Sequence, residues 1–370
     1  MPRWLAEPTR FAALPWRQAR VAGALAVLLV LACFTALQAP GVPAHTQADA
    51  PAAERTPDRT DVLLYQEVID GLRHGQDYYS TAAEAMRRGP YPLKPFVTFR
   101  LPTLAMVQAR LPDWASVALL FAIAIGALAA WWDRFEGAFA RTTVRIVAVI
   151  LLAAGMSSFI RPDLVTFHEV WAGPLIALSL GLRKPGNATA AIAVAAIAML
   201  IRETSALYAG LMLLAAARER RWREVAGWAA ALVLLVVVVA FHAHAVAQVV
   251  RPFDDGSRGW SGMLGFGFAV HVLVLATALS QGPLWLGAPL VGVALIGWAG
   301  WRSPFAKRVL MTLIGYGVLL ALFCRADTYY WVLLAAPLLL PGLAFAPDAI
   351  RDLRSAALDR RRITVTRTRT

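Results

Sequence analysis

The chain is poor in charged residues and in cysteine. Asp, Glu, Lys and Arg together make up 16% of the 370 residues, whereas ordinary soluble domains contain about a quarter. The two cysteines, Cys33 and Cys324, lie in or at the end of apolar blocks, so the sequence implies neither a disulfide framework nor a cysteine-based metal site. The Gly-rich phosphate loop, the HExxH zinc helix and the GxSxG nucleophile turn are also missing. Nucleotide-driven transport, metalloprotease chemistry and serine-hydrolase chemistry are therefore not indicated.

Apolar residues are abundant instead. They make up 59% of the chain and fall in long blocks. A helix needs about 20 apolar residues to cross a hydrocarbon core about 30 Å thick. The sequence therefore predicts an all-α polytopic membrane protein with roughly ten transmembrane helices. The predicted spans are residues 21–37, 114–132, 144–160, 165–182, 188–201, 205–217, 225–241, 283–301, 309–324 and 330–345.

The basic residues predict the orientation. Positive residues favour the cytoplasmic side, and those before the first span are Arg3, Arg10, Arg17 and Arg20. The long charged leader and the lack of a clean cleavage site favour a retained anchor over a signal peptide. We expect a cytoplasmic segment 1–20, a single membrane domain 21–346 and a basic cytoplasmic tail 347–370. Because the net charge of +13 falls in short runs between spans, nucleic-acid binding is not expected.

One pair of apolar blocks conflicts with this orientation. Residues 265–280 and 283–301 both look long enough to cross, yet two crossings would put the basic loop 302–308 outside. One block should therefore not cross fully. His271 and the break at Ser280 favour the earlier block, which we expect to be a surface or re-entrant helix.

The largest hydrophilic stretch, about 38–113, is expected outside. It opens with a Pro/Ala-rich tether, 39–57, that is too poor in bulky apolar residues to pack a core. Residues 61–73 then carry apolar side chains at helical spacing opposite polar ones, which predicts an amphipathic helix on the membrane surface. A second short helix is predicted over residues 80–88.

Several charged residues are expected on this external side. Such residues near membrane depth usually face a cavity or a partner. Arg pairs with phosphate oxygens through two hydrogen bonds, and a carboxylate can deprotonate an attacking hydroxyl, so the mixture suits a phosphate-linked substrate. The candidates are Asp61, Arg88, Arg100, Arg161, His168, Glu169, Arg202, Glu203 and Arg325.

Some of these candidates have simpler interpretations. Arg202 and Glu203 could form an exposed pair at a helix turn, and Arg100 could extend to lipid headgroups. Glu169 lies about one turn into an apolar segment, where an unpaired carboxylate would be costly, so a partner is expected. His242 and His244 could bind a metal only with further ligands.

Three stretches resemble the GT-C superfamily of membrane glycosyltransferases, in its bacterial Rgt-like or mannosyltransferase-like branches. They are 60–65 (TDVLLY), 71–79 (GLRHGQDYY) and 201–204 (IRET). In that superfamily an acidic residue of the first external loop acts as base toward the acceptor, and Asp61 is at that position. The resemblance implies a GT-C-like core with Asp61 as general base. We take Glu169 as a second candidate catalytic residue. The expected substrate-binding residues are Tyr65, Tyr78, Tyr79, Arg88, Arg100, Arg161, His168, Arg202, Glu203 and Arg325.

The resemblance also implies a reaction. A sugar would move from a polyprenyl-phosphate donor to a glycan, lipid or protein acceptor on the outer face of a bacterial inner membrane. No cofactor or metal ligand is assigned, and a divalent-metal requirement stays open. Two alternatives remain: a flippase or transporter for a lipid-linked or anionic substrate, which could use the same charged cavity, and a noncatalytic scaffold, which would not need acids and arginines on one face.

Overall fold

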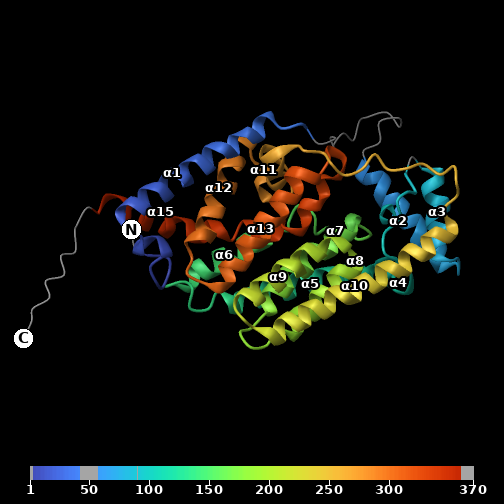
Figure 1. The fold of residues 1–370 in the computed structure, drawn as a ribbon, viewed down its shortest axis with the longest axis horizontal. Helices are drawn as coiled ribbons and strands as arrows, with labels where there is room; N and C mark the ends of the chain where they lie inside the picture. Colours follow the sequence, from blue (N-terminus) through green and yellow to red (C-terminus); the bar gives the residue numbers. More distant parts are fainter. Residues whose placement is uncertain (1–2, 42–56, 90, 360–370) are drawn as a thin grey trace, which may run out of the picture.

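The structure is a computed structural model, and it describes residues 3–41, 57–89 and 91–359. These residues form α-helices and short 3-10 helices, with no β-strand among them. The helices lie side by side in an elongated bundle (Figure 1). In chain order they are α1 (Trp16–Cys33), α2 (Pro57–Arg73), α3 (Tyr78–Arg88), α4 (Thr103–Arg110), α5 (Asp113–Arg134), α6 (Thr142–Ala154), α7 (His168–Leu182), α8 (Thr189–Ile201), α9 (Ala206–Arg218), α10 (Trp222–Val249), α11 (Gly265–Leu275), α12 (Leu284–Gly300), α13 (Pro304–Phe323), α14 (Ala336–Leu339) and α15 (Gly342–Leu358).

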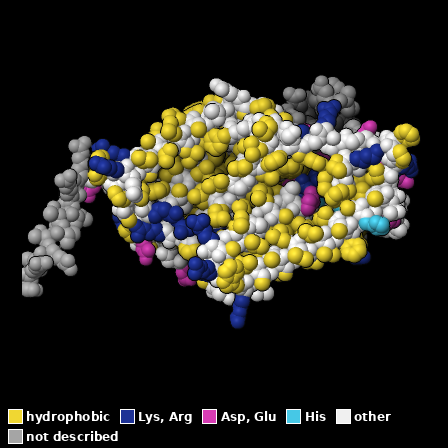
Figure 2. All heavy atoms as spheres, viewed as in Figure 1, with side chains coloured by type: hydrophobic (Ala, Val, Ile, Leu, Met, Phe, Trp, Pro, Cys, Tyr) yellow, Lys and Arg dark blue, Asp and Glu magenta, His cyan; other side chains and the backbone are white. Residues whose placement is uncertain are grey.

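Several of these helices suit a bilayer. Within the described residues four are long and apolar enough to cross one, namely α1 with its 3-10 extension to Gln38, α5, α10 and α13. A fifth candidate is the 3-10 helix η7 (Ala326–Leu334) followed by α14 and α15, which is bent by 55°. Figure 2 shows apolar side chains over most of the visible face. The protein is therefore a helical membrane protein, as its composition predicts.

One end of the bundle carries both ends of the described chain, and we call it the terminal end. There the backbone N–H of Leu5 donates to Asp348 Oδ2 at 2.6 Å, and the Arg10 guanidinium donates to the Trp301 carbonyl at 2.7 Å. The N–H of Ala6 donates to the Ala138 carbonyl. Lys and Arg side chains gather toward this end (Figure 2). Several basic loops thus lie toward this end of the molecule.

The segment expected as a tail from residue 347 differs from that expectation. Helix α15 continues to Leu358, and it buries Asp348 and Asp352 against the N-terminal segment. The Thr9 N–H and hydroxyl both donate to Asp352, at 2.9 and 3.0 Å. These carboxylates accept hydrogen bonds from backbone N–H groups of the N-terminal segment that would otherwise have no partner. Charge composition does not reveal such a long-range contact.

The opposite end carries α2, α3 and α4, and we call it the cavity end. Asp77 caps α3 by accepting the N–H of Ser80 at 2.9 Å. Val68 and Ile69 of α2 are buried against α3 and Phe99 in a second, smaller core. The amphipathic helices of the external region therefore pack their apolar faces against each other and against the rest of the protein. Each apolar face is buried by the other.

Helix α10 packs against the helices at the cavity end. It has 28 residues, a length of about 42 Å, and exceeds the hydrocarbon thickness. Its last turns contribute Val246 and Val249 to the second core. The sequence placed the end of this span at Phe241, and the structure carries the helix past His242 to Val249. The reason is that Pro252 is the first residue after the span that interrupts a helix.

Helix α11 packs between the end of α1 and the start of α12. It has 11 residues, about 16 Å, roughly half the thickness of a hydrocarbon core. Gly267 packs on Thr35, just beyond the end of α1, and Val274 packs on Gly287 in the first turn of α12. Both ends of α11 therefore contact the cavity-end termini of their neighbours. The surface or re-entrant placement expected from the basic loop 302–308 stays a prediction.

Small residues let α12 and α15 approach closely. A Cβ on Gly297 would lie 1.9 Å from the carbonyl oxygen of Gly342, and a Cβ on Gly342 would lie 2.2 Å from that of Ala294. Larger residues would separate the two backbones, as at other small-residue crossings in membranes. The last helix is thereby fixed along the bundle, and η7 before it reaches the cavity end.

Candidate functional site

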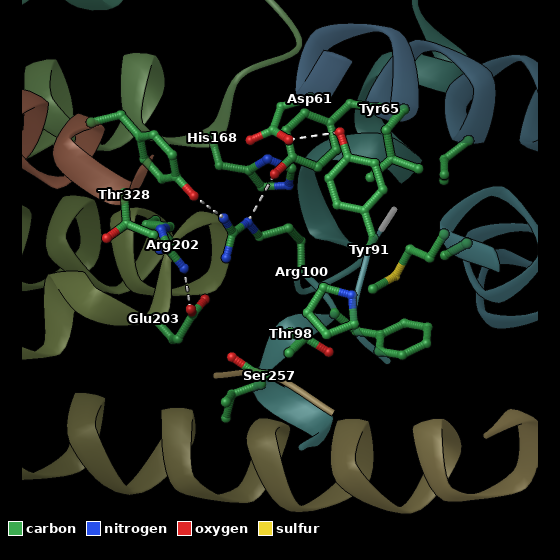
Figure 3. Close-up of a pocket in the computed structure, with 18 of the residues that line it drawn as sticks. Asp61, Tyr65, Tyr91, Thr98, Arg100, His168, Arg202, Glu203, Ser257 and Thr328 are labelled. Atoms are coloured by element: carbon green, nitrogen blue, oxygen red, sulfur yellow. Dashed lines mark hydrogen bonds and ion pairs between the residues drawn. The ribbon is translucent and has the colours of Figure 1, made fainter. Parts of the chain in front are cut away.

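A cavity of about 940 Å³ opens at the cavity end. Its walls come from α2, α3, the loop before α4, the start of α7, the break between α8 and α9, the loop after α10, and η7. Segments from the whole length of the chain therefore meet at one place (Figure 3). The predicted residues that line it are Asp61, Tyr65, Tyr78, Arg100, His168, Arg202, Glu203 and Arg325.

Asp61 projects into this cavity from the second turn of α2 (Figure 3). The hydroxyl of Tyr91 donates to Asp61 Oδ1 at 2.8 Å. Burial and the Asp61 carboxylate raise the pKa of Tyr91 far above its usual value, so the phenol keeps its proton. The helix begins at Pro57, a full turn earlier than the sequence indicated, so Asp61 is not an N-cap.

Arg100 is surrounded by tyrosines at the cavity wall. Its Nε donates to the Tyr65 hydroxyl at 3.0 Å, and one Nη donates to the Tyr330 hydroxyl at 3.4 Å. The Tyr78 hydroxyl holds the backbone by donating to the Arg100 carbonyl at 2.7 Å. Within the described residues no carboxylate forms an ion pair with Arg100. The guanidinium is therefore held by neutral groups and can attract an anion.

Arg202 is only 2% exposed and lies between two carboxylates. Its Nε donates to Glu169 Oε1 at 2.5 Å, and Nη1 donates to Glu203. Glu169 is completely buried and does not line the cavity. It therefore has the partner that its apolar surroundings require. The structure places it behind the wall rather than in contact with the cavity.

Arg325 reaches the cavity with its hydrogen bonds already made. Its Nε and Nη2 donate to Asp327 at 2.9 and 2.6 Å, and Nη1 donates to the Gly259 carbonyl at 2.7 Å. The hydrogen bonds to Asp327 raise the pKa of the guanidinium further. Arg325 therefore ties η7 to the loop after α10.

Three predicted substrate-binding residues lie outside the cavity lining. Tyr79 faces away, and its hydroxyl contacts His242 Nδ1 at 3.2 Å. Arg88 pairs with Glu67 at the surface, and Arg161 pairs with Asp163, with both partners more than half exposed. Exposed pairs of this kind contribute little to stability or selectivity.

Sequence reasoning missed several cavity residues. In the sequence Tyr91 is only a residue between two prolines, and Tyr330 is only a neighbour of interfacial aromatic residues. The other three, Gln108, Thr166 and Trp331, are uncharged and so were not selected. All five line the cavity. An uncharged side chain at a predicted helix end is indistinguishable from an ordinary loop residue, so the sequence held no pattern that could select them.

The described part of the chain holds no group of three His, Cys, Asp or Glu residues able to bind a metal. His242 lies on α10 beside the Tyr79 and Phe96 rings. The two cysteines are buried and unpaired.

Comparison with known proteins gives no relative. No protein-family model, no curated protein and no solved structure matches this chain. Functional inference therefore rests on the cavity itself.

Proposed function

We propose that this protein is a membrane glycosyltransferase that takes a sugar from a polyprenyl-phosphate donor on the outer face of a bacterial inner membrane. The observation that carries the proposal is the pairing of Asp61 with Arg100 in one cavity. One side chain can accept a proton, and the other can hold a phosphate without first leaving a carboxylate. A scaffold would need neither group in a cavity.

The orientation supports an external site. The cavity is at the end of the bundle opposite the basic loops, which the positive-inside rule puts in the cytoplasm. We propose a GT-C-like topology of roughly ten crossings, with α11 remaining on the outer side. The segments that cross are α1, α5, α6, α7, α8, α9, α10, α12, α13 and the bent unit from η7 to α15.

The reaction follows from these two groups. The Asp61 carboxylate accepts the proton of an acceptor hydroxyl, whose oxygen forms a bond to the anomeric carbon of the donor. The bond from that carbon to the phosphate oxygen breaks, and polyprenyl phosphate leaves with the electron pair. Arg100 stabilises the negative charge that grows on the leaving phosphate, which is where a fixed cation has most effect. The tyrosines at its other donors keep the guanidinium in place.

The test is a transfer assay with purified protein in lipid nanodiscs, a labelled polyprenyl-phosphate sugar and extracted envelope glycans, lipids or proteins as acceptors. Asp61→Asn removes the base but retains a side chain that accepts the Tyr91 hydrogen bond. We expect transfer to fall by about 10²- to 10⁴-fold with donor binding unchanged.

The matched control is Asp70→Asn on the same helix. Asp70 is half exposed, pairs with Arg73 and does not line the cavity, so this variant should stay active. Asp61→Asn with more than about a tenth of wild-type transfer would rule out Asp61 as base. Wild-type protein that moves the lipid-linked sugar across a proteoliposome membrane without transferring it would favour the transporter alternative.

A further inference from the structure

Buried polar atoms without partners gather on one wall of the cavity. Among the described residues, cavity-lining side chains of this kind are Gln108, Thr166, His168, Glu203, Thr204 and Trp331. Four of them, Gln108, Thr166, His168 and Trp331, are more than nine-tenths buried. A buried polar atom without a hydrogen bond costs about 1–3 kcal/mol. Such a concentration lowers stability unless water or a ligand supplies the missing bonds.

Local contacts position several of these groups beside the cavity. The Gln108 amide nitrogen donates to the Val165 carbonyl at 2.7 Å, which fixes the amide and leaves its oxygen without a partner. The Phe167 ring packs edge-on against Tyr330, with ring centroids 5.1 Å apart, and so brings η7 beside the start of α7. Figure 3 shows His168 near Arg100 and Arg202 at the same wall.

The mixture of donors and acceptors indicates the chemistry of the ligand. The Gln108 and Glu203 oxygens only accept hydrogen bonds, and the Trp331 indole N–H only donates one. Hydroxyls such as that of Thr166, and a neutral imidazole, do both. A phosphate offers no donor for the two acceptors, a metal cation offers nothing to the indole N–H, and a prenyl chain satisfies none of them. A ring with several hydroxyls can satisfy all.

We infer that this wall, formed by the end of α4, the start of α7, the α8–α9 break and η7, is the subsite for the transferred sugar, and that it takes a neutral, hydroxyl-rich hexose or pentose. Arg100 then binds the phosphate next to it, and the prenyl chain extends outward. The inference rests on the proposed function, and it names the part of the donor that each wall recognises.

The test separates the sugar from the rest of the donor. The probes are a polyprenyl phosphate that carries a neutral hexose or pentose and the same polyprenyl phosphate without a sugar. Each is titrated into protein in nanodiscs. Thr166→Val and Trp331→Phe remove a hydroxyl and an indole N–H while preserving much of the side-chain shape. We expect each variant to bind the sugar-bearing probe about 5- to 30-fold more weakly and the sugar-free probe as wild type does.

Stability supplies a second readout. Since these atoms have no partner among the described residues, their removal should leave the melting temperature of the free protein unchanged or raise it. A structural role would lower it. The matched control is Ser116→Ala, because Ser116 is equally buried and equally without a partner, yet lies on α5 outside the cavity lining. It should change neither probe's affinity.

Two outcomes would overturn the inference: wild-type protein that binds both probes equally, or cavity variants that weaken both probes to the same extent. Neither outcome touches the proposed function, provided that transfer still depends on Asp61. Sugar-dependent binding in a protein that transfers no sugar to any envelope acceptor would have the opposite meaning. The subsite would stand, and the proposed enzyme would fail.

Discussion

At the terminal end, Arg183 and Glu224 are both about 7% exposed and form two hydrogen bonds, at 2.6 and 2.8 Å. Arg308 lies 2.7 Å from Glu219 in the same region. At the cavity end, Arg100 has only tyrosine hydroxyls as partners, and Asp61 accepts a hydrogen bond from a tyrosine. The two regions use the same kinds of charged group, but Arg183 and Arg308 each have a carboxylate partner, whereas Arg100 has none among the described residues.

This difference helps to distinguish charged residues that stabilise the fold of a membrane protein from charged residues that can bind a ligand. Both regions would look alike in a list of charged residues near span ends. A buried Arg–Glu pair is self-sufficient and holds loops together. A guanidinium held by neutral phenols beside a cavity keeps its attraction for an external anion. Arg202 is intermediate, since its two carboxylates fix it while it lines the cavity.

The largest expected effect comes from breaking the terminal pair. Glu224→Gln replaces the nearer carboxylate partner of the buried Arg183 guanidinium with a neutral amide and leaves only Glu219, 3.7 Å away. Loss of one partner of a buried pair typically costs up to about 3–5 kcal/mol. We expect a clearly lower melting temperature in detergent but normal transfer per folded molecule. Asp163→Asn is the control, because its pair with Arg161 is exposed and worth less than about 1 kcal/mol. Equal melting temperatures for the two variants would contradict the comparison.

A smaller effect is expected at the cavity end. Arg100→Lys keeps the charge but loses the planar fork, so affinity for sugar-free polyprenyl phosphate should fall about tenfold, equivalent to one charge-assisted hydrogen bond. The melting temperature should change little, because no ion pair is broken. Arg161→Lys should leave affinity unchanged. If both variants bind equally well, Arg100 contacts lipid headgroups rather than the donor.

The smallest effect concerns the pH dependence of the ion pair that joins α3 to the loop after α10. Two hydrogen bonds from Arg87 on α3 hold the pKa of Asp254 well below its usual range. A depressed folded-state pKa means that this stabilisation is complete above the unfolded value of about 3.9 and is lost as the pH falls toward the lower folded value. The melting temperature of wild type should exceed that of Asp254→Asn by a constant amount between pH 5 and 8. The gap should narrow below about pH 4. A gap that widens in acid would show that the pair is not what attaches α3.

Much of the fold was predictable because it depends on local pattern. The second helix of the external region was predicted over residues 80–88 and spans Tyr78–Arg88, since Asp77 supplies a standard cap. The basic loop 302–308 predicts that the block containing α11 does not cross fully, and this stays a prediction. The C-terminal end of α10 was not predictable from hydropathy. The helix continues beyond the apolar block and ends shortly before Pro252.

The candidate site was predictable only where charge marked it. Asp61, Arg100 and Arg202 were selected because charge is rare in this chain, and all three line the cavity. Glu169 was selected for the same reason, but its burial against Arg202 depends on how α7 packs beside the α8–α9 break, which spacing does not reveal. Thr166 and Trp331 become visible only when their unpartnered atoms are seen in three dimensions.

The bent unit from η7 to α15 has a consequence for biosynthesis. It carries Tyr330 and Trp331 to the cavity, and its far end binds Leu5 and Thr9 through Asp348 and Asp352. Since the chain leaves the ribosome from its N-terminus, these partners are separated by the synthesis of almost every other helix. The early spans are therefore inserted before the cavity is complete. The same late segment completes the cavity wall and binds the N-terminal segment.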